Sequence, residues 1–130
     1  MKRITMLLLA LLMLTGCAAA EPVNPTYRQI TMSEAVEMMS WETNYIILDV
    51  RTLEEYRDGH IPGAINIPNE DIGTKEPLEL PDKDQLILVY CRSGNRSKQA
   101  SRKLAELGYT NIVEFGGIID WPGETVSGLS

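Results

Sequence analysis

The strongest constraint on the fold comes from two compact, largely apolar runs, Tyr45–Val50 (YIILDV) and Gln85–Tyr90 (QLILVY). Short runs without polar alternation are typical of strands that are buried on both faces of a parallel sheet. Three weaker strand patterns lie at Tyr27–Ile30, Ala64–Ile67 and Asn111–Phe115. Helical patterns separate these strands, so the sequence predicts an α/β fold with a mostly parallel central sheet flanked by helices.

Three helical patterns have recognisable ends. Two open on a capping box, in which a glutamate follows a threonine by three residues and each side chain bonds the other's backbone. These boxes are Thr31 with Glu34 and Thr52 with Glu55. Gly59 can end the second helix, and Gly108 is a C-cap candidate for a third helix over Ser97–Leu107. Residues 69–84 are polar with two prolines and predict a loop with one helical turn.

Composition excludes several classes of protein. The chain has 130 residues, 44% of them hydrophobic, which suits one folded domain and not a disordered chain. Its 18 acidic residues outnumber the 12 basic ones, for a net charge of −6, which argues against a nucleic-acid binder. Two cysteines are too few for a disulfide scaffold or a cysteine zinc site.

The first residues have the pattern of an export signal. Lys2 and Arg3 precede the apolar run Met6–Leu14, which is too short to span a bilayer as a helix. The last residue of this run begins the tetrapeptide Leu14–Cys17 (LTGC), which resembles a bacterial lipobox. That resemblance implies cleavage before Cys17 and lipid attachment to its sulfur. An ordinary secretory signal with an incidental cysteine, or an uncleaved anchor, are the alternatives.

This interpretation divides the chain into three parts. Residues 1–16 would be a lipoprotein signal peptide, residues 17–26 a lipidated tether, and residues 27–130 the folded domain. The protein would then be exported and anchored at the extracytoplasmic face of a membrane in the bacterial cell envelope. Without Lys2 and Arg3 the mature side chains carry 10 positive and 18 negative charges, or −8. Cys91 would be the single free thiol.

Chemically distinctive residues follow the strongest strand pattern, in the heptapeptide Cys91–Ser97 (CRSGNRS). Ligands of open α/β sheets bind beyond the carboxyl ends of the strands. A loop that closes onto a helix N-terminus aims backbone N–H groups at one point, and Gly94 permits the required turn. Ser97 is expected to cap the helix. With the charges of Arg92 and Arg96, this environment would stabilise a thiolate at Cys91 and hold an anion beside it.

The heptapeptide and several earlier motifs together resemble the single-domain rhodaneses, a sulfurtransferase family. CRSGNRS is similar to the family's active-site loop, with Cys91 at the position of the cysteine that forms a persulfide. The other matching segments are DVR at Asp49–Arg51, Glu55-Tyr56, GHIPGAINIP at Gly59–Pro68, GGI at Gly116–Ile118, and Trp121-Pro122. They occur in the family's order over about residues 28–123 and imply the rhodanese-like three-layer fold.

The resemblance implies a two-step sulfur transfer with no metal or organic cofactor. Cys91 would take the outer sulfur of thiosulfate or a related donor as a persulfide and pass it to cyanide or a thiol. The binding loop would comprise Arg92, Ser93, Gly94, Asn95, Arg96 and Ser97. Its N–H groups would stabilise the persulfide, and its arginines would attract the anionic donor. Such a domain is expected to act as a monomer that binds no nucleic acid.

Other activities and residues have weaker support. A non-catalytic rhodanese-like module that carries sulfur or binds a partner is the main alternative. A phosphatase or arsenate reductase is weaker, because those loops have five residues between Cys and Arg, whereas four separate Cys91 from Arg96. His60, the one histidine, is expected to be structural. Asp49 and Arg51 are expected to fix a loop by hydrogen bonding.

Overall fold

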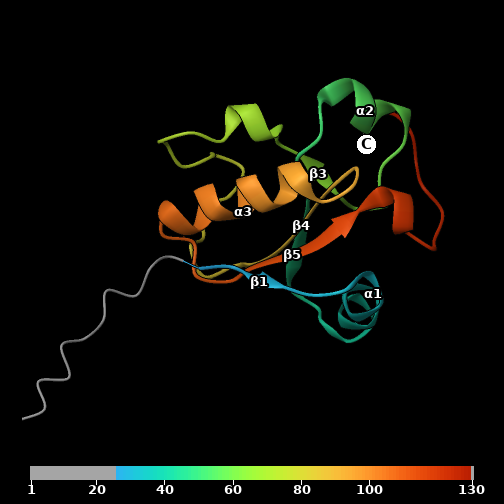
Figure 1. Ribbon diagram of the computed structural model, residues 1–130, viewed down its shortest axis with the longest axis horizontal. Helices are drawn as coiled ribbons and strands as arrows, with labels where there is room; N and C mark the ends of the chain where they lie inside the picture. The colour runs from blue at the N-terminus through green and yellow to red at the C-terminus, as the bar shows by residue number, and fades with distance from the viewer. Residues whose placement is uncertain (1–25, 130) are drawn as a thin grey trace, which may run out of the picture.

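The computed structural model describes residues 26–129, which form one α/β domain (Figure 1). Cys17, the signal segment and all but the last residue of the predicted tether lie outside the described residues. Five parallel strands form the sheet in the order β1-β5-β4-β2-β3. The strands are β1 (Arg28–Gln29), β2 (Tyr45–Asp49), β3 (Ile65–Asn66), β4 (Leu86–Cys91) and β5 (Ile112–Gly117). The predicted mostly parallel sheet is confirmed.

Helices cover the sheet on both sides. The α-helices are α1 (Met32–Trp41), α2 (Leu53–Asp58) and α3 (Asn95–Glu106), and the 3-10 turns are η1 (Asn69–Asp71) and η2 (Ile118–Asp120). In Figure 1, α3 lies over one face of the sheet and α1 over the other, which gives the three-layer arrangement. None of the helices between residues 26 and 129 combines the length and apolar character that crossing a bilayer requires.

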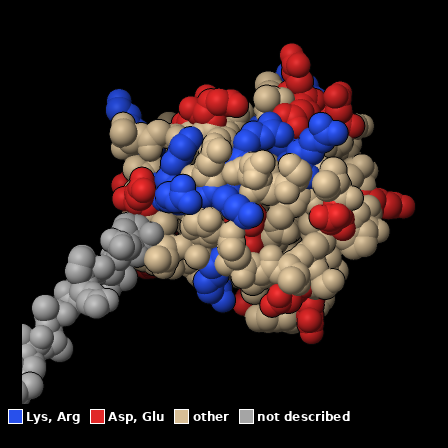
Figure 2. All heavy atoms as spheres, viewed as in Figure 1, with Lys and Arg blue, Asp and Glu red and all other residues tan. Residues whose placement is uncertain are grey.

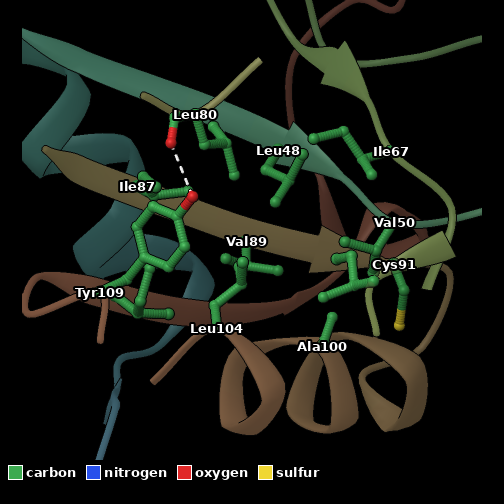
Figure 3. Close-up of a cluster of buried hydrophobic side chains, with 12 residues drawn as sticks. Leu48, Val50, Ile67, Leu80, Ile87, Val89, Cys91, Ala100, Leu104 and Tyr109 are labelled. Atoms are coloured by element: carbon green, nitrogen blue, oxygen red, sulfur yellow. Dashed lines mark hydrogen bonds between the residues drawn. The ribbon is translucent and has the colours of Figure 1, made fainter. Parts of the chain in front are cut away.

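The central strand β4 is buried on both faces. Its odd-numbered residues, Cys91 among them, pack in a cluster with Ala100 and Leu104 of α3 (Figure 3). Its even-numbered residues pack in a second cluster with Ala35 of α1 and Tyr56 of α2. This alternation explains why QLILVY lacks polar positions, because both faces of the strand lie in the core.

The predicted helix signals are confirmed except at the start of α3. Both capping boxes form, at Thr31 and at Thr52. Gly59 ends α2, but its backbone is extended, with φ of 169°, and needs no special freedom. Gly108 follows α3 in the left-handed region, at φ of +99°, as predicted for a C-cap glycine.

The predicted cap at Ser97 is wrong. Helix α3 begins at Asn95, and its N-cap is Gly94, in the left-handed region at φ of +113°. Gly94 reverses the chain immediately after the cysteine, so the helix starts two residues earlier than expected. Ser97 therefore lies inside the first turn, and its hydroxyl donates to the Gly94 carbonyl at 2.9 Å.

Strand β5 is longer than predicted because it reaches the loop that follows Cys91. Gly117 is paired with Cys91 across an irregularity in the β4–β5 register. A Cβ on Gly117 would overlap the backbone of Arg92 and Ser93. The glycine thus allows β5 to pack directly beneath the loop that follows Cys91.

Candidate active site

Cys91 lies where β4 meets the turn into α3, at the carboxyl end of the sheet. It is 1% exposed, and its Sγ accepts a hydrogen bond from the Gly94 N–H at 3.0 Å. Figure 3 shows its sulfur at the edge of the core cluster, beside Ala100. The strand, the glycine turn and the helix thus place a thiol beside the positive end of the α3 dipole, as the sequence predicted.

The other loop residues separate into an exposed rim and a buried base. Arg92, Ser93 and Asn95 are exposed, whereas Gly94 and Ser97 are buried. Within residues 26–129 no ion pair involves Arg92, so its guanidinium faces solvent beside the loop. The exposed residues can therefore contact a small anion, while the buried residues lie against the sulfur of Cys91.

Arg96 is held by α2. Its Nη1 and Nη2 donate to the two carboxylate oxygens of Glu55 at 2.6 and 3.0 Å. Hydrogen bonding from Arg96, with the Thr52 backbone also contributing, lowers the pKa of Glu55 to about 2. Conversely, the hydrogen bond to Glu55 raises the pKa of Arg96. This pairing was not evident from the sequence, and it makes Arg92 the loop arginine without a carboxylate partner.

Two cavities flank the loop. One, of about 410 Å³, is lined by Arg92 together with Arg51, Glu55, Asp58, Gly59, Ile118, Ile119 and Thr125. The other, of about 310 Å³, is lined by Ser93, Gly94 and Lys98 together with Glu114 and Asp120. Only the first cavity includes the unpaired Arg92, so it suits the approach of an anion.

The charge distribution over α3 supports anion binding. Figure 2 shows Lys and Arg side chains gathered over the outer face of α3, while Asp and Glu occupy much of the surrounding surface. The helix contributes Arg96, Lys98, Arg102 and Lys103, and no acidic residue before Glu106. In a chain of net charge −6 this is a local excess of positive charge, and the first turn of α3, which contains Arg96 and Lys98, is the turn next to Cys91.

Asp49 and Arg51 fix the loop after β2, as the sequence predicted. Arg51 donates from Nε and Nη2 to the buried Asp49 carboxylate, and its Nη2 also donates to the Gly59 carbonyl. The Tyr90 hydroxyl donates to Asp49 at 2.6 Å. Burial, with the charge of Asp49, raises the pKa of Tyr90. The network ties together the ends of β2 and β4 that border the site.

His60 has the geometry of a structural residue, in agreement with its prediction. The ring is 1% exposed and stacks on Tyr56 with centroids 3.7 Å apart. Its Nδ1 lies 2.8 Å from the Tyr56 carbonyl, which can only accept, so this nitrogen carries the proton. The His60 backbone pairs with Val126 and fastens the C-terminal segment.

Glu114 lies near Cys91, although the sequence analysis did not identify this residue. It lies on β5, is 3% exposed, and accepts hydrogen bonds at Oε2 from the Ser97 hydroxyl and the Gly116 N–H, both at 2.9 Å. The available signal was a carboxylate inside NIVEF, a strand pattern otherwise apolar and leading into Gly116-Gly117. Only the packing of β5 against α3 shows that this carboxylate lies behind the cysteine.

Comparison with known proteins identifies the family of the domain. Residues 31–123 match the rhodanese-like domain family, and residues 1–18 match the prokaryotic membrane lipoprotein lipid attachment site. "Thiosulfate sulfurtransferase PspE" of Escherichia coli is 41% identical over 73 residues, covering 56% of this chain and 70% of PspE. The "Putative sulfur carrier protein YrkF" of Bacillus subtilis is 33% identical over 98 residues, covering 75% of this chain and 52% of YrkF. The chain therefore spans about half the length of YrkF.

A solved structure supports the same fold. A "rhodanese with anions from E. coli" superposes with a TM-score of 0.59 at 38% sequence identity. The match covers 65% of this chain and 99% of that structure. The fold and the family match together define the class: this chain belongs to the rhodanese-like domain family, whose relatives here are of the sulfurtransferase kind. It also carries the sequence of a bacterial lipoprotein attachment site.

Proposed function

We propose that this protein is a sulfurtransferase that carries a sulfane sulfur on Cys91 between an anionic donor and a thiophilic acceptor. The observation that carries the proposal is the Cys91 sulfur, which accepts the Gly94 N–H at the N-terminus of α3. A thiolate or persulfide there is stabilised by the helix dipole and by an N–H aimed at it. The PspE name supports thiosulfate as the donor.

The proposed reaction divides into two displacements. The Cys91 thiolate attacks the outer sulfur of thiosulfate, the donor S–S bond breaks, and sulfite leaves with the electron pair. The product is a Cys91 persulfide. Cyanide or a thiolate then attacks the terminal persulfide sulfur, and the Cys91 thiolate leaves. Because the enzyme itself carries the sulfur between the two steps, ping-pong kinetics are expected.

Arg92 is the residue that we expect to guide the donor. It is exposed beside Cys91 and lines the cavity of about 410 Å³, whereas the Arg96 charge is neutralised by Glu55. The Arg96–Glu55 pair also weakens the phosphatase alternative, because such a reaction would require that arginine to hold an oxyanion over the sulfur. Ser93 and Asn95 complete the proposed rim, and Ser97 lies beneath the sulfur.

The test is mass spectrometry of the full chain after incubation with thiosulfate. We expect one added sulfur atom on the peptide that contains Cys91, and its removal when cyanide is added. Cys91→Ser is expected to abolish both, whereas Cys17→Ser should leave them intact. Failure of the wild-type chain to take sulfur from thiosulfate or any other sulfane donor would contradict the proposal.

A sulfur carrier is the second candidate function, and the name of YrkF favours it. A carrier would accept one sulfur on Cys91 but release it only to a dedicated partner. Steady-state production of thiocyanate from thiosulfate and cyanide separates the two functions. Sustained turnover supports the sulfurtransferase, whereas stoichiometric loading without turnover supports the carrier.

We also propose that the domain acts at the cell envelope. The support is the match of residues 1–18, which include Cys17, to the lipoprotein attachment site. In this proposal residues 1–16 are removed, Cys17 carries the lipid, and residues 17–26 tether the domain of residues 27–130 to the extracytoplasmic face of a membrane. The reacting partners are then a small sulfur anion and a thiol or cyanide outside the cytoplasm.

A further inference from the structure

A chain of polar groups leads from the Cys91 sulfur into the interior of the domain. The Cys91 thiol lies 3.4 Å from the Ser97 hydroxyl, to which it donates. The same hydroxyl lies 2.9 Å from Oε2 of Glu114. The three residues come from β4, α3 and β5, and they are 1%, 0% and 3% exposed. The tertiary fold therefore joins a thiol to a buried carboxylate through one hydroxyl.

Within the part of the chain that the structure describes, the carboxylate of Glu114 has no positive partner. Its hydrogen bonds come from two neutral donors, the Ser97 hydroxyl and the Gly116 N–H, and no ion pair formed within residues 26–129 includes it. Burial of a carboxylate without a cation disfavours its charged form. The thiol of Cys91 is the titratable group that Ser97 connects to this carboxylate.

The hydroxyl of Ser97 has one hydrogen, and the Gly94 carbonyl at 2.9 Å is a further acceptor for it. Two arrangements of this hydrogen connect the thiol of Cys91 to Glu114. In the first, the thiol donates to Ser97, and Ser97 donates to the carboxylate of Glu114. In the second, protonated Glu114 donates to Ser97, and Ser97 donates to the thiolate of Cys91. The total charge is the same in both, because one proton has moved from sulfur to oxygen. In neither arrangement does the buried site hold two negative charges at once.

We propose that Glu114 receives the proton of Cys91 through Ser97, so that the thiolate forms without releasing a proton to solvent. The role of this proton transfer in catalysis rests on the proposed sulfurtransferase function. Glu114 does not touch the donor and acts through Ser97, so it is a positioning residue for the proton.

The proton balance closes over one catalytic cycle. The thiol proton moves to the Ser97 oxygen as the original hydroxyl proton moves to Glu114. Sulfur then attacks the donor, sulfite leaves with the electron pair, and Glu114 keeps the proton while the persulfide exists. When a thiolate or cyanide removes the outer sulfur, the Cys91 thiolate leaves. The proton can then return through Ser97, so the chain consumes no external acid or base.

Several charged groups surround this chain and enter its pH dependence. Lys98 of α3 and Asp120 of η2 line the same cavity as Glu114 and oppose each other in sign. Arg92 follows Cys91 directly, and Arg96 is neutralised by Glu55 of α2. These charged groups are present in every variant below. Differences between the variants therefore report on the hydrogen-bonded series of Cys91, Ser97 and Glu114.

The test compares the wild-type full chain with Glu114→Gln, whose amide oxygen can still accept both hydrogen bonds. The matched control is Glu106→Gln, which removes the same charge from the exposed end of α3. Thiolate ultraviolet absorbance is measured against pH as a difference from Cys91→Ser, so that Cys17 cancels. Sulfur loading from thiosulfate is timed over the same pH range, and circular dichroism checks the fold.

We expect the wild-type thiolate signal to appear in two steps, because a coupled pair loses its protons separately. Glu114→Gln should show one step, and below its midpoint loading should slow by about tenfold for each pH unit. Ser97→Ala, which interrupts the chain, should slow loading most at mildly acidic pH. Glu106→Gln should match the wild type.

The outcomes separate the inference from the proposed function. Superimposable titrations of the wild type and Glu114→Gln would overturn the proton transfer, even if sulfur loads normally. A two-step wild-type titration with no loading from any sulfane donor would overturn the proposed function and leave the proton transfer standing. Uniformly slower loading at every pH in Glu114→Gln, with an unchanged titration, would assign Glu114 a structural role only.

Discussion

At the scale of single residues, the site depends on two glycines with different physical roles. Gly94 adopts φ of +113°, a conformation that side chains rarely tolerate, and this turns the chain so that its N–H meets the Cys91 sulfur. Gly117 has an ordinary backbone conformation but no room for a Cβ, because the Arg92–Ser93 backbone lies directly against it. Gly94 thus sets the turn of the loop, and Gly117 allows β5 to pack closely against the loop backbone.

Gly117→Ala is therefore expected to lower the free energy of unfolding by roughly 1–3 kcal/mol, the usual cost of overpacking. It should also slow sulfur loading, because the loop must move away from β5. Gly73→Ala is the control, since a Cβ there meets nothing within 4 Å. Urea unfolding measures both variants, and equal stability for Gly117→Ala and Gly73→Ala would contradict the close packing.

At the scale of elements, Glu55 connects two helices. Its side chain closes the capping box of α2 by accepting from the Thr52 N–H, which is a local interaction. It also binds both terminal nitrogens of Arg96 on α3, which no local pattern predicts. The position of α3 relative to α2 therefore depends on a residue that the sequence identifies only as a cap.

The pKa of Glu55 makes this contact testable by pH. Its folded pKa of about 2 lies below the ordinary 4.5, so the pairing stabilises the fold above about pH 4.5. That stabilisation is lost as the pH falls through about 2. Glu55→Gln keeps an N3 side chain that suits a capping box but removes the charge. We expect its unfolding free energy to fall less than that of the wild type over this range.

Thermal unfolding at a series of pH values measures the effect. The matched control is Glu54→Gln, the exposed neighbour on α2, which should follow the wild type. Parallel stability curves for the wild type and Glu55→Gln would show that the ion pair contributes nothing to the fold.

At the scale of the whole molecule, the two cysteines serve different parts of the chain. Cys91 is enclosed by the fold, while Cys17 belongs to the lipoprotein attachment site before the described domain. The surface combines a net negative charge with basic residues gathered over α3 (Figure 2). Anion attraction therefore depends on local placement of charge and not on the total.

Anchoring gives the prediction at this scale. Bacteria that express the full chain and are fed a labelled fatty acid should incorporate label into the protein. Cys17→Ser should abolish the incorporation, while Cys91→Ser should leave it unchanged. A mature protein that still contains residues 1–16, or label that persists in Cys17→Ser, would contradict the proposed anchor.

Local patterns were sufficient to predict most elements and the position of Cys91 at the end of a strand. Both capping boxes, the central strands and the turn at Gly94 depend on neighbours within a few residues, so the sequence shows them directly. The start of α3 was predicted at Ser97 because a serine is a common cap. The glycine conformation placed the start earlier.

By itself, then, the sequence determined the parallel α/β architecture, the thiol at the end of β4 and the helix that follows it. Tertiary structure alone decided the partners of the site: Glu55 on Arg96, Gly117 under Arg92, and Glu114 behind Ser97. The physical reason is separation along the chain. Strand and helix patterns reflect short-range backbone geometry, whereas these contacts form only when β5, α2 and α3 pack around β4.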